Sequence, residues 1–272
     1  MKLNSPIRPI LALVALSLAG TASAVLVDFN TTGELAGNFS LNGGAAYSEE
    51  AGTGLNSTRA VNVASITGTA ILTTANYSLA LGTVNVSMYA RAVASANAGF
   101  DSVFLQLGLF ADNNQQFNGG AGDANQFVFA RVLNQNNTTA GNDTTYFLQT
   151  GSKDTTAAAQ STTNGGNFTL TSGNWYYFSI NFTRSSSDTV TVASDLRNSD
   201  SAGVVGTSVT TLSTNYTNAQ IFGDTTIWAG FRGRLDGNTD TLDNFSAVPE
   251  PSTAMALLGG FGALAWVRRR NR

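Results

Sequence analysis

The chain of 272 residues contains no cysteine and no histidine, and lysine is nearly absent. Without cysteine and histidine, a Ser-His-Asp triad, a cysteine nucleophile, a His-ligated zinc site and a haem-attachment motif are all excluded. No disulfide can form either, so the packed core and its hydrogen bonds must stabilise the fold alone. Asparagine, threonine, serine and glycine supply most of the polar surface instead.

The first 24 residues have the pattern of a secretory signal peptide. Lys2 and Arg8 form a small basic region, residues 10–18 form an apolar core, and residues 22–24 read Ala-Ser-Ala, a small-residue cleavage site. This pattern predicts a signal-peptide helix that is read by the Sec translocon and removed by signal peptidase. The mature chain is then expected to begin at Val25.

The last 25 residues have three parts in a fixed order. An extended proline-containing motif comes first, an apolar run second and a basic cluster last: Val248, Pro249, Glu250, Pro251 and Ser252; residues 253–267; and Arg268, Arg269, Arg270 and Arg272. Each proline disfavours helix in the residue before it, so the motif should be extended and accessible. The apolar run has about 15 residues, or roughly 22 Å of helix. That is short of a bilayer core of about 30 Å, but arginines can snorkel. The run therefore predicts a transmembrane helix with its basic end in the cytoplasm.

This three-part tail resembles the PEP-CTERM sorting signal of Gram-negative bacteria. The resemblance implies that an exosortase, a membrane-embedded cysteine transpeptidase, recognises the Pro-Glu-Pro motif and removes the tail. It implies an intermediate anchored in the inner membrane, followed by transfer to the cell surface or extracellular matrix. It also implies a species that makes extracellular polysaccharide. A permanent single-span anchor is the alternative that the residues leave open.

The net charge of the chain indicates which classes of partner it can bind. The whole chain has a formal net charge of −3. Removal of both ends takes away two basic residues at the start and four arginines at the end, but only one glutamate. The mature domain is therefore more acidic than the whole chain, which is not the footprint of a nucleic-acid-binding protein. Such acidity suits solubility and interaction with divalent cations or cationic polymers.

Residues 25–247 are expected to form one all-β domain. Strand-like segments recur between clusters of Gly, Asn, Asp and Ser, and residues 83–93 alternate cleanly between apolar and polar side chains. This period of two indicates a half-buried strand. No long segment of the mature chain shows a helical apolar period with caps. The pattern predicts an antiparallel β-sandwich or jelly roll, and residues 175–183 and 189–196 should form a hairpin.

Part of this domain resembles the concanavalin A/laminin-G-like sandwich. The resemblance rests on the Trp-initiated hairpin of residues 175–196 and on the segments IWAGF (227–231) and LDNFS (242–246). It implies that the first and last strands lie side by side. We therefore expect residues 25–29 to pair near residues 241–248.

A calcium site is one hypothesis for the loop before the last strand. Asp236, Asn238, Asp240 and Asp243 place oxygen atoms at closely spaced positions, and Asp28 could add a ligand from the neighbouring strand. Oxygen ligands of this kind suit Ca²⁺, although the pattern is not an EF-hand. The alternative is a loop of turn-forming residues whose side chains bond their own backbone. No other cofactor is indicated.

Aromatic residues are the candidates for sugar binding. We single out Trp175, Tyr177 and Trp228, because carbohydrate sites use ring faces together with planar amides. Strand alternation should place Tyr176 on the opposite face from Trp175 and Tyr177. The alternative for each tryptophan is packing in the core.

Catalysis by paired carboxylates finds little support. Before the sorting motif the mature chain has three glutamates, Glu34, Glu49 and Glu50, and the last two are adjacent, so on a strand they would face opposite ways. The Glu-x-Asp-x-x-Glu pattern of concanavalin A-like glucanases is absent. An aspartate pair from distant strands stays open, since the sequence does not show which strands meet.

Taken together, the sequence predicts a non-catalytic exported protein of the cell surface or extracellular matrix, associated with exopolysaccharide or a biofilm matrix. A carbohydrate-binding or Ca²⁺-dependent adhesion module is the main alternative, and a glycoside hydrolase is the third.

Overall fold

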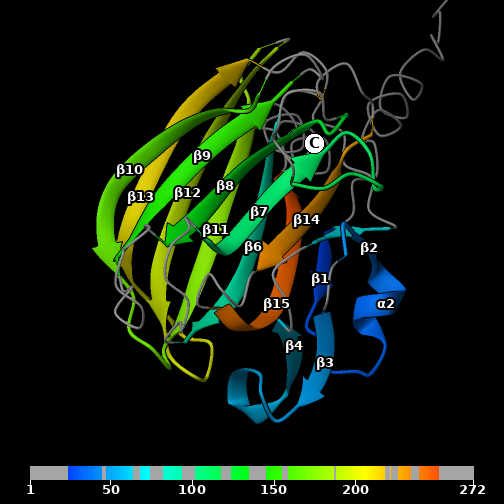
Figure 1. The fold of residues 1–272 in the computed structure, drawn as a ribbon, viewed down its shortest axis with the longest axis vertical. Coiled ribbons are helices and arrows are strands. Elements are labelled where there is room, and N and C mark those ends of the chain that lie inside the picture. The colour runs from blue at the N-terminus through cyan, green and yellow to red at the C-terminus, as the bar shows by residue number, and fades with distance from the viewer. Residues whose placement is uncertain are drawn as a thin grey trace, which may run out of the picture.

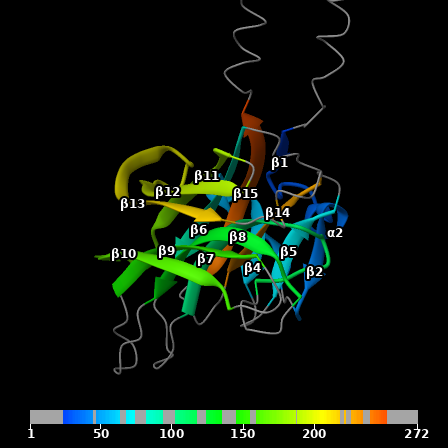
Figure 2. The ribbon, with the colours of Figure 1, turned by 90° about the horizontal axis from the view of Figure 1, so that it is seen from above.

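The computed structural model describes residues 24–44, 47–63, 68–73, 82–93, 102–117, 124–134, 145–154, 159–186, 188–217, 221, 226–233 and 239–250. These residues form two antiparallel β-sheets that pack face to face (Figures 1 and 2). The predicted antiparallel sandwich is confirmed. A short helix, α2 (Glu34–Asn38), and a 3-10 turn, η1 (Leu55–Ser57), are the helical elements of the described residues.

Sheet A is the sheet that contains both the first and the last strand. Its order is β13 (Val205–Thr217), β12 (Thr189–Ser199), β11 (Trp175–Arg184), β6 (Thr83–Ala92), β15 (Thr239–Glu250), β4 (Arg59–Val63) and β3 (Tyr47–Ala51), and β1 (Val25–Val27) also pairs with β15.

Sheet B covers the other side of the core. Its order is β10 (Ser161–Thr169), β9 (Thr145–Lys153), β8 (Phe127–Asn134), β7 (Ser102–Phe110), β14 (Trp228–Gly233), β5 (Thr69–Leu72) and β2 (Phe39–Asn42).

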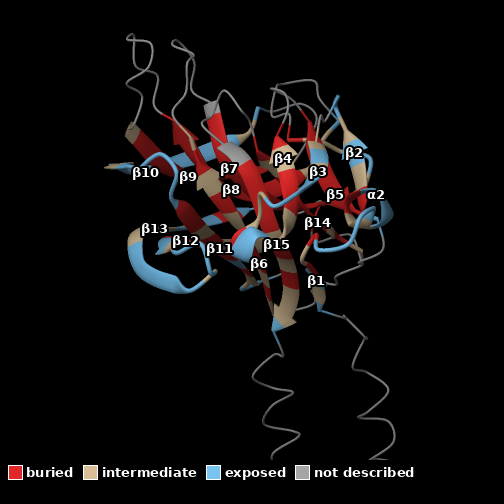
Figure 3. Cartoon of the chain, turned by 90° about the horizontal axis from the view of Figure 1, so that it is seen from below, coloured by how far each residue is buried: buried red, intermediate tan, exposed pale blue. Residues whose placement is uncertain are grey.

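The core lies between the two sheets and follows from strand alternation. In β6, Val84, Val86, Met88 and Ala90 are buried, and the residues between them face outward. Phe178 of β11 lies in the same core cluster as Leu107 of β7. Full burial of such a side chain contributes about 1.5–3 kcal/mol, so this cluster supplies the main stabilisation of a protein without disulfides. Figure 3 shows burial concentrated in the strands that face the interior, whereas β13 is largely exposed.

The predicted hairpin is confirmed in β11 and β12. The two strands pair in unbroken register from Trp175 opposite Ser199 to Arg184 opposite Val190. The Ser185 N–H donates to the Thr189 carbonyl at 3.0 Å and begins the turn.

The predicted pairing of the first and last strands is also confirmed. Val25 lies opposite Ala247, and Val27 lies opposite Phe245. Strand β15 continues beyond the domain boundary predicted at residue 247, with Pro249 opposite Val84 of β6. Figure 2 shows β1 and the end of β15 at the same edge of the sandwich.

Much of the predicted tail lies outside the described residues. Pro251, Ser252, the apolar run of residues 253–267 and Arg268, Arg269, Arg270 and Arg272 belong to this part. Within the described part of the chain, no helix is long and apolar enough to cross a membrane.

Candidate functional site

An open groove crosses the outer face of sheet A. Its volume is about 420 Å³, and outward side chains of β11, β12 and β13 line it: Ser179, Asn181, Ala193, Asp195, Thr211 and Ser213. These residues form two rows in register, because Ser179 pairs with Asp195 and Asp195 with Thr211, and the other three follow in the same order. We call this surface the polar groove. It presents hydroxyl, amide and carboxylate groups around one apolar residue, Ala193.

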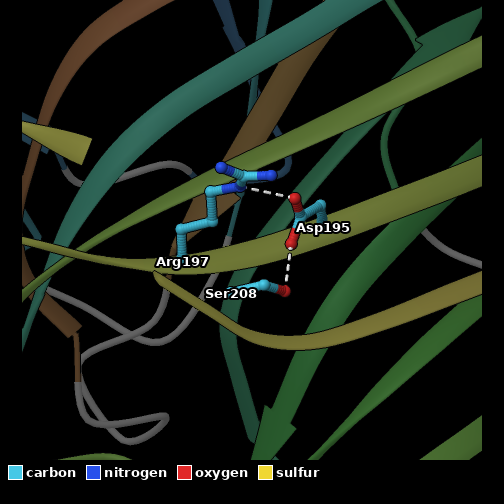
Figure 4. Close-up of polar contacts among 3 residues, drawn as sticks. All are labelled: Asp195, Arg197 and Ser208. Carbon is cyan, nitrogen blue, oxygen red and sulfur yellow. Dashed lines mark hydrogen bonds and ion pairs between the residues drawn. The ribbon is translucent and has the colours of Figure 1, made fainter. Parts of the chain in front are cut away.

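Asp195 is held in a fixed orientation at the groove. Its Oδ2 lies 2.6 Å from Arg197 Nε, and its Oδ1 accepts from Ser208 Oγ at 2.6 Å (Figure 4). The two charged side chains are 24% and 44% exposed, so this ion pair contributes at most about 1 kcal/mol to stability. A β-bulge lies here, where the register shifts between Leu196 and Arg197. Bulges re-aim side chains, and the two partners fix the direction of the carboxylate.

Tyr177 borders the polar groove. It precedes Ser179 by two positions on β11, so both side chains share the outer face of sheet A. Its ring centroid lies 4.8 Å from that of Tyr89, and Tyr89 donates its hydroxyl to the Gly203 carbonyl at 3.0 Å. The half-buried Tyr177 ring therefore offers an aromatic surface beside a polar groove, while Tyr176 faces the core as alternation predicts.

The two predicted tryptophans lie elsewhere. Trp175 is on the same face as Tyr177 but is only 5% exposed, with the Arg91 guanidinium carbon 5.8 Å from its ring centroid. Trp228 lies on sheet B, half-buried against a cluster of outward apolar residues that includes Phe110 and Phe127. The structure thus does not bring Trp175, Tyr177 and Trp228 together into one site.

Asp243, a predicted calcium ligand, accepts hydrogen bonds from the backbone. It is 1% exposed, and its carboxylate accepts from the Leu55 N–H at 2.9 Å and the Asn244 N–H at 2.8 Å. Burial raises the pKa of Asp243 to about 6, although both hydrogen bonds favour the charged form. The carboxylate thereby holds η1 against β15.

Asp28 is the other predicted calcium ligand whose side chain is described, and its charge contributes to the raised pKa of Asp243. Asp28 accepts from its neighbour Asn30, through the backbone N–H at 3.3 Å and the side-chain amide at 2.8 Å. Asp236 and Asn238 lie outside the described residues, and the side chain of Asp240 is not described either. The part of the chain that is described contains no group of three or more acidic side chains placed to hold a metal ion.

The three glutamates considered for catalysis have local partners. Glu49 accepts from the N–H groups of Gly33 and Leu35, both at 2.6 Å, and so caps the start of α2. Glu50 points the other way and accepts from the Asn62 side chain, as strand alternation predicts. Glu34 accepts from the Thr31 N–H at 3.0 Å.

A second polar surface crosses the outer face of sheet B. Five residues lie opposite one another on successive strands, from β14 through β7, β8 and β9 to β10: Arg232, Gln106, Arg131, Gln149 and Asn164. We call this set the polar row. Sequence reasoning missed it, because the five residues lie on five different strands whose order was unknown. The available signal was a polar residue in the middle of two apolar segments, Gln106 in β7 and Arg131 in β8.

Most of the polar row is tied together by hydrogen bonds. Arg131 Nε donates to Gln149 Oε1 at 2.7 Å, and Gln149 Nε2 donates to Asn164 Oδ1 at 2.6 Å. Arg232 Nη1 donates to the Phe117 carbonyl at 3.3 Å. Gln106 differs, because it is 0% exposed and neither of its side-chain amide atoms has a hydrogen-bond partner among the described residues.

Comparison with known proteins bears on the tail and on the fold. Residues 247–272 match the family model of the PEP-CTERM protein-sorting motif, so the chain carries this motif at its C-terminus, which implies recognition by an exosortase. A search of curated proteins found no relative that matches the sequence.

Among solved structures, the basic winged bean lectin with Tn-antigen is 13% identical, with a TM-score of 0.51, over 84% of this chain and 100% of the lectin. Lectin II from Ulex europaeus is 15% identical, with a TM-score of 0.46, over 84% and 99%. The PL-14 alginate lyase from Aplysia kurodai is 10% identical, with a TM-score of 0.48, over 85% and 100%. The first likeness shows the concanavalin A-like sandwich and nothing about its ligand.

Proposed function

We propose that the mature domain is a non-catalytic protein of the cell surface or extracellular matrix, and that it associates with exopolysaccharide through the polar groove of sheet A. The observation that carries this proposal is the groove itself, with Ser, Thr, Asn and Asp side chains in register on three adjacent strands. Neighbouring strands lie about 4.8 Å apart, a spacing that suits hydrogen bonds to successive hydroxyl groups of a sugar chain.

The shape and the borders of the groove support a polymer as the ligand. It is open rather than enclosed, so a chain can run across it without an end entering a pocket. The ring of Tyr177 beside it offers an apolar surface on which a sugar face can pack. Asp195, with its direction fixed by Arg197 and Ser208, provides a strong acceptor for sugar hydroxyls.

The arrangement of carboxylates favours binding over hydrolysis. Asp195 is the one acidic side chain among the described residues that line the groove. Glycoside hydrolysis generally needs two carboxyl groups about 5–10 Å apart. The mature glutamates Glu34, Glu49 and Glu50 serve local hydrogen bonds instead.

The route to the surface follows from the two ends of the chain. In this proposal the Sec translocon exports the protein, signal peptidase removes residues 1–24, and the tail anchors an inner-membrane intermediate until an exosortase removes it. Replacement of Pro249, Glu250 and Pro251 by alanine should leave the tail-carrying form in the membrane fraction. Equal release of the variant and the unaltered protein, measured on immunoblots of cells and medium, would remove the basis for this route.

Filling the groove tests the function directly. Ala193→Tyr places a ring in the groove and should weaken binding to the exopolysaccharide of the host by about tenfold or more, corresponding to about 1.4 kcal/mol. Thr189→Tyr, on the same face of β12 outside the groove, is the matched control. Co-sedimentation with the purified polymer measures both variants. Equal binding by Ala193→Tyr and the unaltered protein would exclude the groove as the site.

The same assay tests calcium. Asp28, Asp236, Asn238, Asp240 and Asp243 remain a proposed Ca²⁺ site. If Ca²⁺ supports adhesion, EDTA should release the bound polymer and added Ca²⁺ should restore it. Binding that EDTA leaves unchanged would exclude this role.

A further inference from the structure

We infer that the polar row on sheet B is a second binding site, specific for an acidic saccharide whose carboxylate or sulfate group binds Gln106 between Arg232 and Arg131. This inference rests on the proposed association with polysaccharide and names a substrate class for it. It concerns the opposite face of the sandwich from the polar groove.

The register of the strands places the three residues side by side. Arg232 lies opposite Gln106, and Gln106 lies opposite Arg131, on the adjacent strands β14, β7 and β8. With about 4.8 Å between strands, the two arginine backbones lie roughly 10 Å apart, with the amide between them. One anionic group can therefore accept from the Gln106 Nε2 while two cations flank it.

Gln106 is the observation that points to a ligand. Its side chain is fully buried, and neither amide atom finds a partner among the described residues. A buried amide without hydrogen bonds destabilises the folded state, and an apolar side chain of similar size would not. Its neighbours along β7, Leu105 and Leu107, pack in the core and anchor the strand. The strand therefore does not need a glutamine between them.

Arg131 is oriented before any ligand arrives. Its Nε donates to Gln149, which in turn donates to Asn164, and its guanidinium carbon lies 5.0 Å from the ring centroid of Phe129. A preoriented guanidinium loses less conformational entropy when it binds an anion.

An acidic sugar fits this surface better than a free inorganic anion. Beside the polar row, outward aromatic residues form a cluster on the same face of sheet B. Phe129 belongs to this cluster and also contacts the Arg131 guanidinium of the polar row. Two positive charges on a predominantly acidic domain select for an anion, since guanidinium groups match carboxylate and sulfate oxygens. Because Gln106 has no exposed surface, binding requires local opening of this face, where Phe117 packs against Gly108.

The experiment compares three polymers on the exported protein: polygalacturonate, dextran sulfate and neutral dextran. Gln106→Leu should raise the melting temperature and weaken binding of the preferred acidic polymer by about tenfold or more. Thr189→Tyr, on sheet A and outside both the polar groove and the polar row, is the control and should keep acidic binding. Arg131→Gln should reduce both the affinity and its salt dependence.

The outcomes separate the two proposals. Unaltered protein that binds neutral dextran but neither acidic polymer overturns the acidic site and leaves the proposed function intact. Gln106→Leu that is more stable but binds acidic polymer normally also overturns it, and identifies Gln106 as a purely structural residue. Acidic binding lost in Gln106→Leu and kept in Thr189→Tyr supports the site, and the preferred polymer identifies the carboxylate or the sulfate. Protein that binds none of the three polymers nor the host exopolysaccharide overturns both proposals.

Discussion

At the scale of single residues, Asp243 is a buried carboxylate that connects two distant segments of the chain. Its carboxylate is buried and holds the N–H of Leu55 from a segment distant in the sequence. Gly54 makes this approach possible, because a Cβ at that position would lie 2.7 Å from Asp243 Oδ2 and 2.7 Å from the Arg59 carbonyl oxygen. Asp243, which the sequence also suggests as a metal ligand, therefore serves as a structural acceptor for η1.

The raised pKa of Asp243 predicts a pH dependence of stability. The pKa is 3.8 in a model peptide and about 6 in the folded protein, so between these values the folded state binds more protons than the unfolded state. The Asp243 contribution to the free energy of unfolding should therefore fall as the pH rises through this window and stay constant above it. The difference is at most about 3 kcal/mol.

Urea unfolding at several pH values between 4 and 8 measures this dependence. Asp243→Asn does not titrate, so the difference between the unaltered protein and the variant isolates the contribution of this one group. A difference that does not change with pH would contradict the prediction.

Gly54→Ala should destabilise the protein by about 1–3 kcal/mol, since the added methyl group meets a carboxylate and a backbone carbonyl that cannot both move. Gly37→Ala is the control. It lies within α2 with no atom within 4 Å of the added Cβ, so the change should be neutral or slightly stabilising. Thermal unfolding compares the two variants, and equal melting temperatures would refute the role of Gly54.

At the scale of elements, α2 depends on a side chain from another segment. The helix has 5 residues, its N-cap Gly33 has a φ of 94°, and its own side chains provide no cap. Glu49 of β3 supplies the missing acceptors to the N–H groups of Gly33 and Leu35. Such a helix could not be predicted from its own sequence.

Glu49→Gln should therefore destabilise the protein by about 1–2 kcal/mol, because it weakens two charge-assisted hydrogen bonds at the start of the helix. Glu50→Gln is a closely matched control, since this neighbour is exposed and its carboxylate accepts from the Asn62 side-chain amide, not from the helix. Its effect should stay below about 0.5 kcal/mol. Denaturant midpoints of both variants test the prediction, and equal effects would argue against the cap.

The predictable elements were those with one buried face. Alternation in β6, β11 and β12 revealed their position and the hairpin, because every second side chain enters the core. The extent of the edge strands β13 and β10 could not be predicted from the sequence, because most of their residues are exposed and show no apolar period. Near β13 the sheets are joined by hydroxyl groups, with Thr150 Oγ1 2.9 Å from the Tyr216 hydroxyl. Likewise, the groove and the polar row depend on strand order, which alternation does not contain.

At the scale of the whole molecule, the sorting motif begins inside the sheet. Val248 lies opposite Asn85, and Glu250 lies opposite Thr83, so the start of the motif is paired with β6. The predicted extended conformation is present in the described residues of the motif, Val248 to Glu250, and a processing enzyme must separate these residues from β6 before it can enclose them.

A disulfide can test this requirement cleanly, since the chain has no cysteine. Asn85→Cys with Val248→Cys should fasten the motif to β6 in an oxidising compartment and delay removal of the tail, and a reductant should restore it. Thr83→Cys with Thr183→Cys joins β6 to β11 and leaves β15 free, which makes it the control. Tail removal at the normal rate in the first variant, with its disulfide verified by mass spectrometry, would contradict the requirement.

The partnership of β1 with β15 has a consequence for the finished protein. The end of β15 pairs with β6 up to Glu250 and with β1 up to Ala247, so cleavage beyond Glu250 leaves the newly made carboxyl end paired with β6 and next to β1. The shortened chain begins and ends at one seam, and a short linker across that seam should yield a circularly permuted module that folds as the original does.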